Sequence, residues 1–115
     1  MRILVLGDVF GRPGRSILFE RLRQVRRDYA LDRVVANGEN ASGGLGLTAK
    51  AARQLLEAGI DVMTGGNHTF RRSDIIPFFE TTDRLLRPAN YPPGAPGAGC
   101  LVCRPKDGPP YAVIN

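Results

Sequence analysis

Short apolar runs alternate with amphipathic segments along the first eighty residues, and this alternation limits the fold more than any other feature. Residues 2–6, 33–36 and 60–64 are rich in branched aliphatic side chains, and the first of them has the character of a strand buried on both faces. Strands that alternate with helices build a layered α/β fold around a largely parallel sheet. We therefore expect a βαβαβα arrangement in the first two-thirds of the chain.

The segments between these runs predict helices. Thr48 is placed as the N-cap of a helix that passes through Leu55, and Gly59 is placed to end it. A shorter helix is expected from 74 to about 80, capped by Ser73 and broken early by a proline. The first helix follows the first strand, and its apolar residues recur at helical spacing. These residues are Leu18, Leu22, Val25 and Tyr29.

A turn-rich connection and a β-hairpin are expected in the last third. Residues 87–99 contain four prolines and three glycines, which mark turns. The runs 100–104 and 111–114 predict two strands joined across 106–108. Because a domain rarely ends on an apolar strand, we expect residues 1–115 to be the N-terminal portion of one domain whose C-terminal half is absent.

Composition excludes several classes of protein. Apolar runs of a few residues fall far short of the ~20 needed to span a bilayer, and Asp8 comes too early for a signal peptide. Cys100 and Cys103 are the only cysteines, too few for a disulfide scaffold. Their offset of three places them on opposite faces of a strand, which favours ordinary packing over metal or redox chemistry. We expect a cytoplasmic protein that does not contact membranes.

Polar side chains follow each of the three predicted strands. The carboxyl ends of parallel strands share one edge of the sheet, where ligands bind, so we expect these side chains to converge. Carboxylate, amide and imidazole groups suit manganese, iron or zinc, and two such ions can clamp a phosphoryl group. Taken alone, each residue is more often a turn former or a structural residue than a ligand, and the site is indicated by the occurrence of such residues at three strand ends. The residues are Asp8, then Asn37, Glu39 and Asn40, then Asn67 and His68.

The same blocks resemble the metal-binding motifs of calcineurin-like metallophosphoesterases. The motifs are Gly-Asp at 7–8, Asn-Gly-Glu-Asn at 37–40 and Gly-Asn-His at 66–68. Longer segments resemble one bacterial branch, the YmdB-like phosphodiesterases that act on 2′,3′-cyclic nucleotides. These segments are 3–15, 36–46, 66–70 and 87–92.

The resemblance implies an α-β-β-α sandwich and a two-metal phosphodiesterase. It implies Asp8 as a ligand of one metal, Glu39 as the bridge and Asn40 as an auxiliary ligand. Asn67 would bind the second metal and His68 would donate a proton. The ions would be iron, manganese or zinc, the substrate a small phosphate ester or cyclic nucleotide, and the protein a homo-oligomer.

This sequence differs from the family pattern at two positions, and it lacks the histidine ligands of the family's second half. Phe10 stands where the wider superfamily has a histidine, although the YmdB-like branch also lacks it. Arg71 stands where the branch tends to have an acidic residue, which could alter a salt link near His68. Family members are more than twice as long, and their second half supplies several histidine ligands. We therefore expect this chain alone to bind metal weakly and to be nearly inactive.

A non-catalytic nucleotide- or RNA-binding α/β module is the alternative. Gly7, Gly11 and Gly14 do not have the spacing of a dinucleotide fingerprint. The net charge of +5 suits anionic partners, and an RNA-contacting stripe would use the arginines of the first helix. A solvated face partly paired with Glu20 and Asp28 is the favoured interpretation. These arginines are Arg15, Arg21, Arg23, Arg26 and Arg27.

Overall fold

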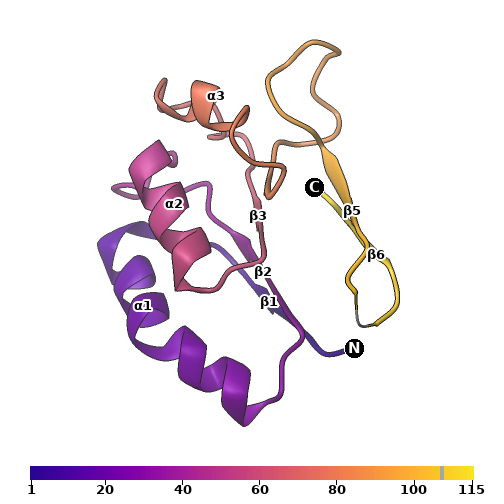
Figure 1. The fold of residues 1–115 in the computed structure, drawn as a ribbon. Helices are drawn as coiled ribbons and strands as arrows, with labels where there is room; N and C mark the ends of the chain where they lie inside the picture. The colour runs from indigo at the N-terminus through magenta and orange to yellow at the C-terminus, as the bar shows by residue number, and fades with distance from the viewer. Residues whose placement is uncertain (107) are drawn as a thin grey trace.

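The computed structural model describes residues 1–106 and 108–115 as helices, a parallel sheet and a separate antiparallel hairpin (Figure 1). The parallel sheet has the strand order β1-β2-β3-β4, with β1 at Ile3–Leu6, β2 at Arg33–Asn37, β3 at Val62–Thr64 and β4 at Leu85–Leu86. The helices are α1 (Gly11–Asp28), α2 (Ala49–Ala58) and α3 (Ile75–Phe78). The hairpin pairs β5 (Cys100–Cys103) with β6 (Tyr111–Ile114).

The predicted alternation of strands and helices is confirmed, with one strand added. All three neighbouring pairs of the sheet are parallel, as crossover connections through helices allow. The added strand, β4, is two residues long and pairs Leu85 with Met63. A strand this short has no alternation by which the sequence could reveal it.

The core lies between the sheet and the helices, so that one face of the sheet is buried. Burial of this apolar surface is the main stabilising contribution to the fold. Within β2, Val34 and Ala36 are fully buried and alternate with partly exposed neighbours. Leu55 of α2 and Leu22 of α1 pack against them in one cluster.

Both predicted ends of α2 are confirmed, whereas those of α3 are corrected. The Thr48 hydroxyl accepts a hydrogen bond from the Ala51 amide, and Gly59 ends the helix at a φ of 120°. The regular part of α3 is shorter than the expected 74–80, and its N-cap is Asp74 rather than Ser73. The Asp74 carboxylate instead accepts a bond from the Ala49 amide at the start of α2.

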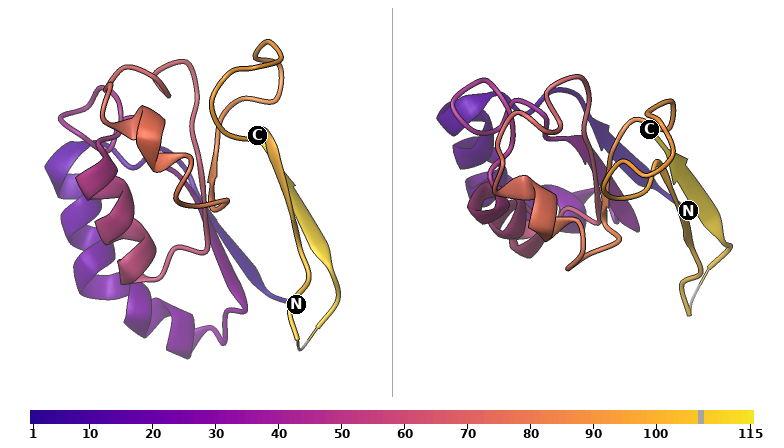
Figure 2. Two further views of the ribbon diagram at one scale, coloured as in Figure 1. Left: turned by 45° about the horizontal axis from the view of Figure 1, so that its top comes forward. Right: turned by 90° about the horizontal axis from the view of Figure 1, so that it is seen from above.

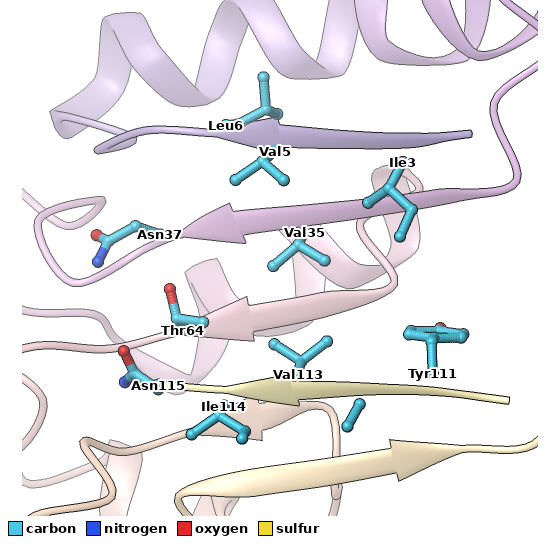
Figure 3. A pocket seen from close by; sticks show the side chains of 11 residues that line it. Ile3, Val5, Leu6, Val35, Asn37, Thr64, Tyr111, Val113, Ile114 and Asn115 are labelled. Carbon is cyan, nitrogen blue, oxygen red and sulfur yellow. The ribbon is translucent and has the colours of Figure 1, made fainter. Parts of the chain in front are cut away.

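The expectation that the first strand is buried on both faces is wrong. β1 is an edge strand, and Val5 is 72% exposed. Helices cover one face of the sheet, and the hairpin lies across from the other (Figure 2). Between sheet and hairpin is an apolar cleft of about 440 Å³. Figure 3 shows Val5, Val35 and Val113 lining it.

Three of the four layers of the expected sandwich are present: helices, parallel sheet and hairpin (Figure 2). In the described part of the chain no helix covers the outer side of the hairpin. None of the described helices is long and apolar enough to cross a membrane.

The two ends of β6 connect the hairpin to the parallel sheet. The Arg33 guanidinium lies 5.6 Å from the centroid of the Tyr111 ring. Burial, followed by a hydrogen bond with Cys103, raises the pKa of Tyr111. After β6, the Asn115 amide donates to the carbonyl oxygens of Gly65 and Leu86, each at 3.2 Å. The hairpin is therefore anchored at both edges of the parallel sheet, by Tyr111 where β2 begins and by Asn115 where the parallel strands end.

A candidate metal centre at the carboxyl edge of the sheet

Four of the five predicted site residues form one hydrogen-bonded cluster. The Asn40 amide nitrogen donates to Asp8 Oδ2 at 2.9 Å. On its other side, Asn40 Oδ1 lies 2.7 Å from His68 Nδ1. The His68 backbone amide donates to Glu39 Oε2 at 3.2 Å. Side chains that follow β1, β2 and β3 thus meet at one edge of the sheet, as the parallel topology requires.

The orientation of the Asn40 amide determines which nitrogen of His68 carries a proton. An ionised carboxylate only accepts hydrogen bonds, so the Asn40 group facing Asp8 is its NH₂. Asn40 Oδ1 therefore faces His68 and accepts from Nδ1–H. In neutral His68 the other ring nitrogen, Nε2, keeps its lone pair and is free to meet a ligand.

The carboxylate of Glu39 is held in a backbone turn. Its side chain is 17% exposed, and a Cβ added at Gly66 would collide with Oε2. Only glycine at position 66 permits this approach. The Asn37 side chain fixes the turn, because its Oδ1 accepts from the Glu39 amide and its Nδ2 donates to the Gly65 carbonyl, both at 3.2 Å.

Asn67 is the predicted ligand that the described structure does not bring into this cluster. Its residue is exposed, and no hydrogen bond of its side chain is found among the described residues. It lies between Gly66 and His68, so its backbone is part of the same turn. Its role as a metal ligand stays a prediction.

The two departures from the family pattern lie outside the cluster. The exposed Arg71 side chain makes no ion pair within the described residues, and its backbone amide donates to the His68 carbonyl. The Phe10 ring is 60% exposed, and its tip touches Gly44, where an added Cβ would approach within 2.6 Å. Within the described residues, the carboxylate paired with His68 is that of Glu39, at 3.9 Å; an effect of Arg71 on this pair stays a prediction.

Arginine side chains hold the glycine-rich loop that follows Asn40. Arg72 donates to the carbonyl oxygens of Leu45 and Ser42, at 3.1 and 3.2 Å. Arg15 of α1 donates to the Ala41 carbonyl. The segment just after His68 is thereby connected to the loop just after Glu39 and Asn40.

The donor set fits a hard or borderline divalent cation. Asp8 and Glu39 supply carboxylates, while the amide oxygen of Asn40 keeps a second lone pair besides the one used by His68. Within the described residues, histidine, cysteine, aspartate and glutamate alone do not form a group of three able to hold a metal. Amide oxygens are therefore needed, and the set is too small to fill two coordination spheres.

Fold and cluster together define an α/β protein with a polar site at the carboxyl edge of a parallel sheet. The sequence model of the YmdB-like protein family matches residues 4–115. The chain belongs to the YmdB-like family, as the resemblance of its motifs predicted.

Known relatives agree with this assignment. The chain is 42% identical over 115 residues to the 2′,3′-cyclic-nucleotide 2′-phosphodiesterase of Bacillus subtilis, covering all of this chain and 43% of that protein. The crystal structure of a hypothetical protein from Thermus thermophilus superposes with a TM-score of 0.89 and 38% identity, covering 99% of this chain and 44% of that one. A Mycoplasma pneumoniae structure described as a novel phosphatase superposes with a TM-score of 0.81 and 35% identity, covering 89% of this chain and 38% of that one. The chain thus spans less than half the length of these relatives.

Proposed function

We propose that the full-length protein is a metal-dependent phosphodiesterase that hydrolyses phosphate esters, with 2′,3′-cyclic nucleotides as substrates. The proposal is supported most directly by the cluster in which Asn40 joins Asp8 to His68 beside Glu39. It is also supported by the name of the Bacillus subtilis relative.

In this proposal Asp8, Glu39, Asn40 and Asn67 hold two divalent ions, which are iron, manganese or zinc. When bound, such ions activate a water molecule and neutralise charge on the phosphoryl group. The described carboxylates and amides are the contribution of this chain, and further ligands come from residues beyond 115.

His68 is the proposed proton donor. Asn40 accepts from Nδ1–H and so fixes the imidazole ring with Nε2 directed away from Asn40. When the ring is doubly protonated, Nε2 carries the proton that the leaving oxygen needs as its bond to phosphorus breaks. Glu39 Oε2, 3.9 Å from Nδ1, adds a negative charge beside the ring.

We propose further that residues 1–115 are the N-terminal portion of a single metallophosphoesterase domain. The coverage of 43% of the Bacillus subtilis relative supports this, and so does the open apolar cleft beside β1. A homo-oligomeric assembly and a cytoplasmic location stay predictions.

The proposal is tested by hydrolysis of 2′,3′-cyclic AMP by the full-length protein with excess Mn²⁺. We expect turnover that His68→Gln lowers by about 10²- to 10⁴-fold, since the variant cannot protonate the leaving group. No hydrolysis with manganese, iron or zinc would refute the proposal. We expect the 115-residue chain to be nearly inactive in the same assay, and robust turnover would show that four ligands suffice.

The structure gives less support to the RNA-binding alternative. Arg26 is bound within the fold, because it forms a 3.0 Å ion pair with Asp61 and donates to the Gly59 carbonyl. An arginine engaged in this way is not free to follow a phosphate backbone. Among the described residues, none of the helix arginines forms the expected ion pair with Glu20 or Asp28.

A further inference from the structure

The backbone amide and carbonyl of Gly66 are held by two side chains that are not candidate metal ligands. The Tyr91 hydroxyl donates to the Gly66 carbonyl at 3.1 Å. The Thr69 hydroxyl accepts from the Gly66 amide at 2.9 Å and donates to the same carbonyl at 2.6 Å. Thr69 is only 3% exposed, so its hydroxyl is shielded from water.

Gly66 is the point at which the backbone touches the candidate metal centre. Its Cα faces the Glu39 carboxylate closely enough that a Cβ would collide with it. Asn67 follows directly, and the next amide, that of His68, donates to Glu39 Oε2. A displacement of the Gly66 peptide would therefore move three candidate site residues at once.

Tyr91 is itself fixed from outside the cluster. Its ring centroid lies 5.7 Å from that of Phe70, and its backbone amide donates to the Pro88 carbonyl in a turn. The Ala89 amide, in the same turn, donates to the Asn115 carbonyl at 2.7 Å. The turn around 88–91 thus connects the hairpin to Gly66.

We propose that Tyr91, together with Thr69, is a positioning residue of the metal centre. Its hydroxyl holds the Gly66 carbonyl, which keeps the 66–68 turn against Glu39 and directs Asn67 and His68 to the site. This inference rests on the proposed function. It adds a role for the 87–92 segment, which supplies none of the predicted ligands.

The test compares Tyr91→Phe with the unsubstituted chain. The variant keeps the ring against Phe70 and removes only the hydroxyl. Tyr29→Phe is the matched control, because Tyr29 is exposed and its backbone carbonyl contacts Arg2, just before β1 begins, at the opposite edge of the sheet from the cluster. Two quantities are measured: Mn²⁺ affinity by electron paramagnetic resonance, and exchange of the His68 amide proton in metal-free protein by NMR. The Met63 amide, which bonds to the Arg84 carbonyl in the sheet, serves as the internal reference.

We expect Tyr91→Phe to weaken Mn²⁺ binding and to accelerate His68 exchange, each about threefold to tenfold, as the loss of one hydrogen bond implies. Exchange at Met63 stays unchanged, and Tyr29→Phe alters neither quantity. Unchanged Mn²⁺ affinity and His68 exchange would overturn the inference. Equal acceleration at Met63 and His68 would also overturn it, because the hydroxyl would then stabilise the fold in general.

A second pair of variants tests the contribution of Thr69, the other side chain that holds this turn. Thr69→Val removes both hydroxyl bonds at nearly constant volume, whereas Thr69→Ser retains them. We expect the His68 amide to exchange faster in Thr69→Val and at the rate of the unsubstituted chain in Thr69→Ser. If the full-length protein does not hydrolyse 2′,3′-cyclic AMP, the proposed function fails, while His68 exchange still decides whether Tyr91 holds the turn.

Discussion

His68 Nδ1 lies 2.7 Å from Asn40 Oδ1, although the two residues are 28 positions apart. The opposite end of the same amide bonds to Asp8. This amide fixes both the ring orientation of His68 and the position of its proton. The chemistry proposed for His68 depends on this contact.

Substitution of Asn40 should change the tautomer of His68. Without the Asn40 oxygen, Nδ1–H loses its acceptor, and the Nε2–H form that predominates in free imidazole side chains should gain population. We expect the ¹⁵N spectrum of neutral His68 to show Nδ1–H in the unsubstituted chain and mainly Nε2–H in Asn40→Ala. Retention of Nδ1–H in the variant would contradict the assigned role of Asn40.

Gly66→Ala should be much more damaging than Gly7→Ala. A Cβ at 66 would collide with the Glu39 carboxylate, whereas at 7 it would meet no atom within 4 Å. We expect Gly66→Ala to lower the free energy of unfolding by about 1–3 kcal/mol, measured by urea denaturation. Equal effects of the two substitutions would show that Glu39 can move aside freely.

Arg72→Ala should loosen the glycine-rich loop, since it removes bonds to the Ser42 and Leu45 carbonyls. We expect faster amide hydrogen exchange over 42–46 and a destabilisation of about 0.5–1.5 kcal/mol. Arg71→Ala is the control, because no side-chain hydrogen bond of Arg71 is found among the described residues. The account is wrong on this point if both variants loosen the loop equally.

The hairpin should lose stability at high pH. Burial and Cys103 raise the pKa of Tyr111 above its ordinary value of 10.0, so the folded state holds the phenol proton more tightly than the unfolded state. This stabilisation is complete below the unfolded pKa and is lost as pH rises through the folded pKa. An ultraviolet difference titration against Tyr111→Phe should place the Tyr111 midpoint above that of a model tyrosine. A midpoint at or below it would contradict the buried environment.

Contacts that follow from strand topology could be predicted from the sequence. Asp8, Glu39 and His68 each lie in the loop that follows a strand of one parallel sheet, so their convergence required only the order of the elements. The exposure of β1 could not be predicted, because an apolar run does not indicate whether a second layer covers it.

Contacts made by irregular segments also could not be predicted from the sequence. Tyr91 reaches Gly66 across 25 positions, and Asn115 reaches Gly65 across 50. Tyr91 belongs to a stretch without periodicity, where turns determine the path of the chain, and Asn115 follows β6, whose pattern does not indicate what lies beyond its end. Their roles became visible only through the hydrogen bonds of the structure.

The central claim is that acids and amides from separate strand ends bind divalent cations together. Titration of the 115-residue chain with Mn²⁺, followed by electron paramagnetic resonance, tests it most directly. We expect weak saturable binding that Asp8→Asn and Glu39→Gln each reduce by about tenfold or more, and that Glu57→Gln on the exposed face of α2 leaves unchanged. Binding unaffected by Asp8→Asn and Glu39→Gln, or no binding at all, would contradict the account.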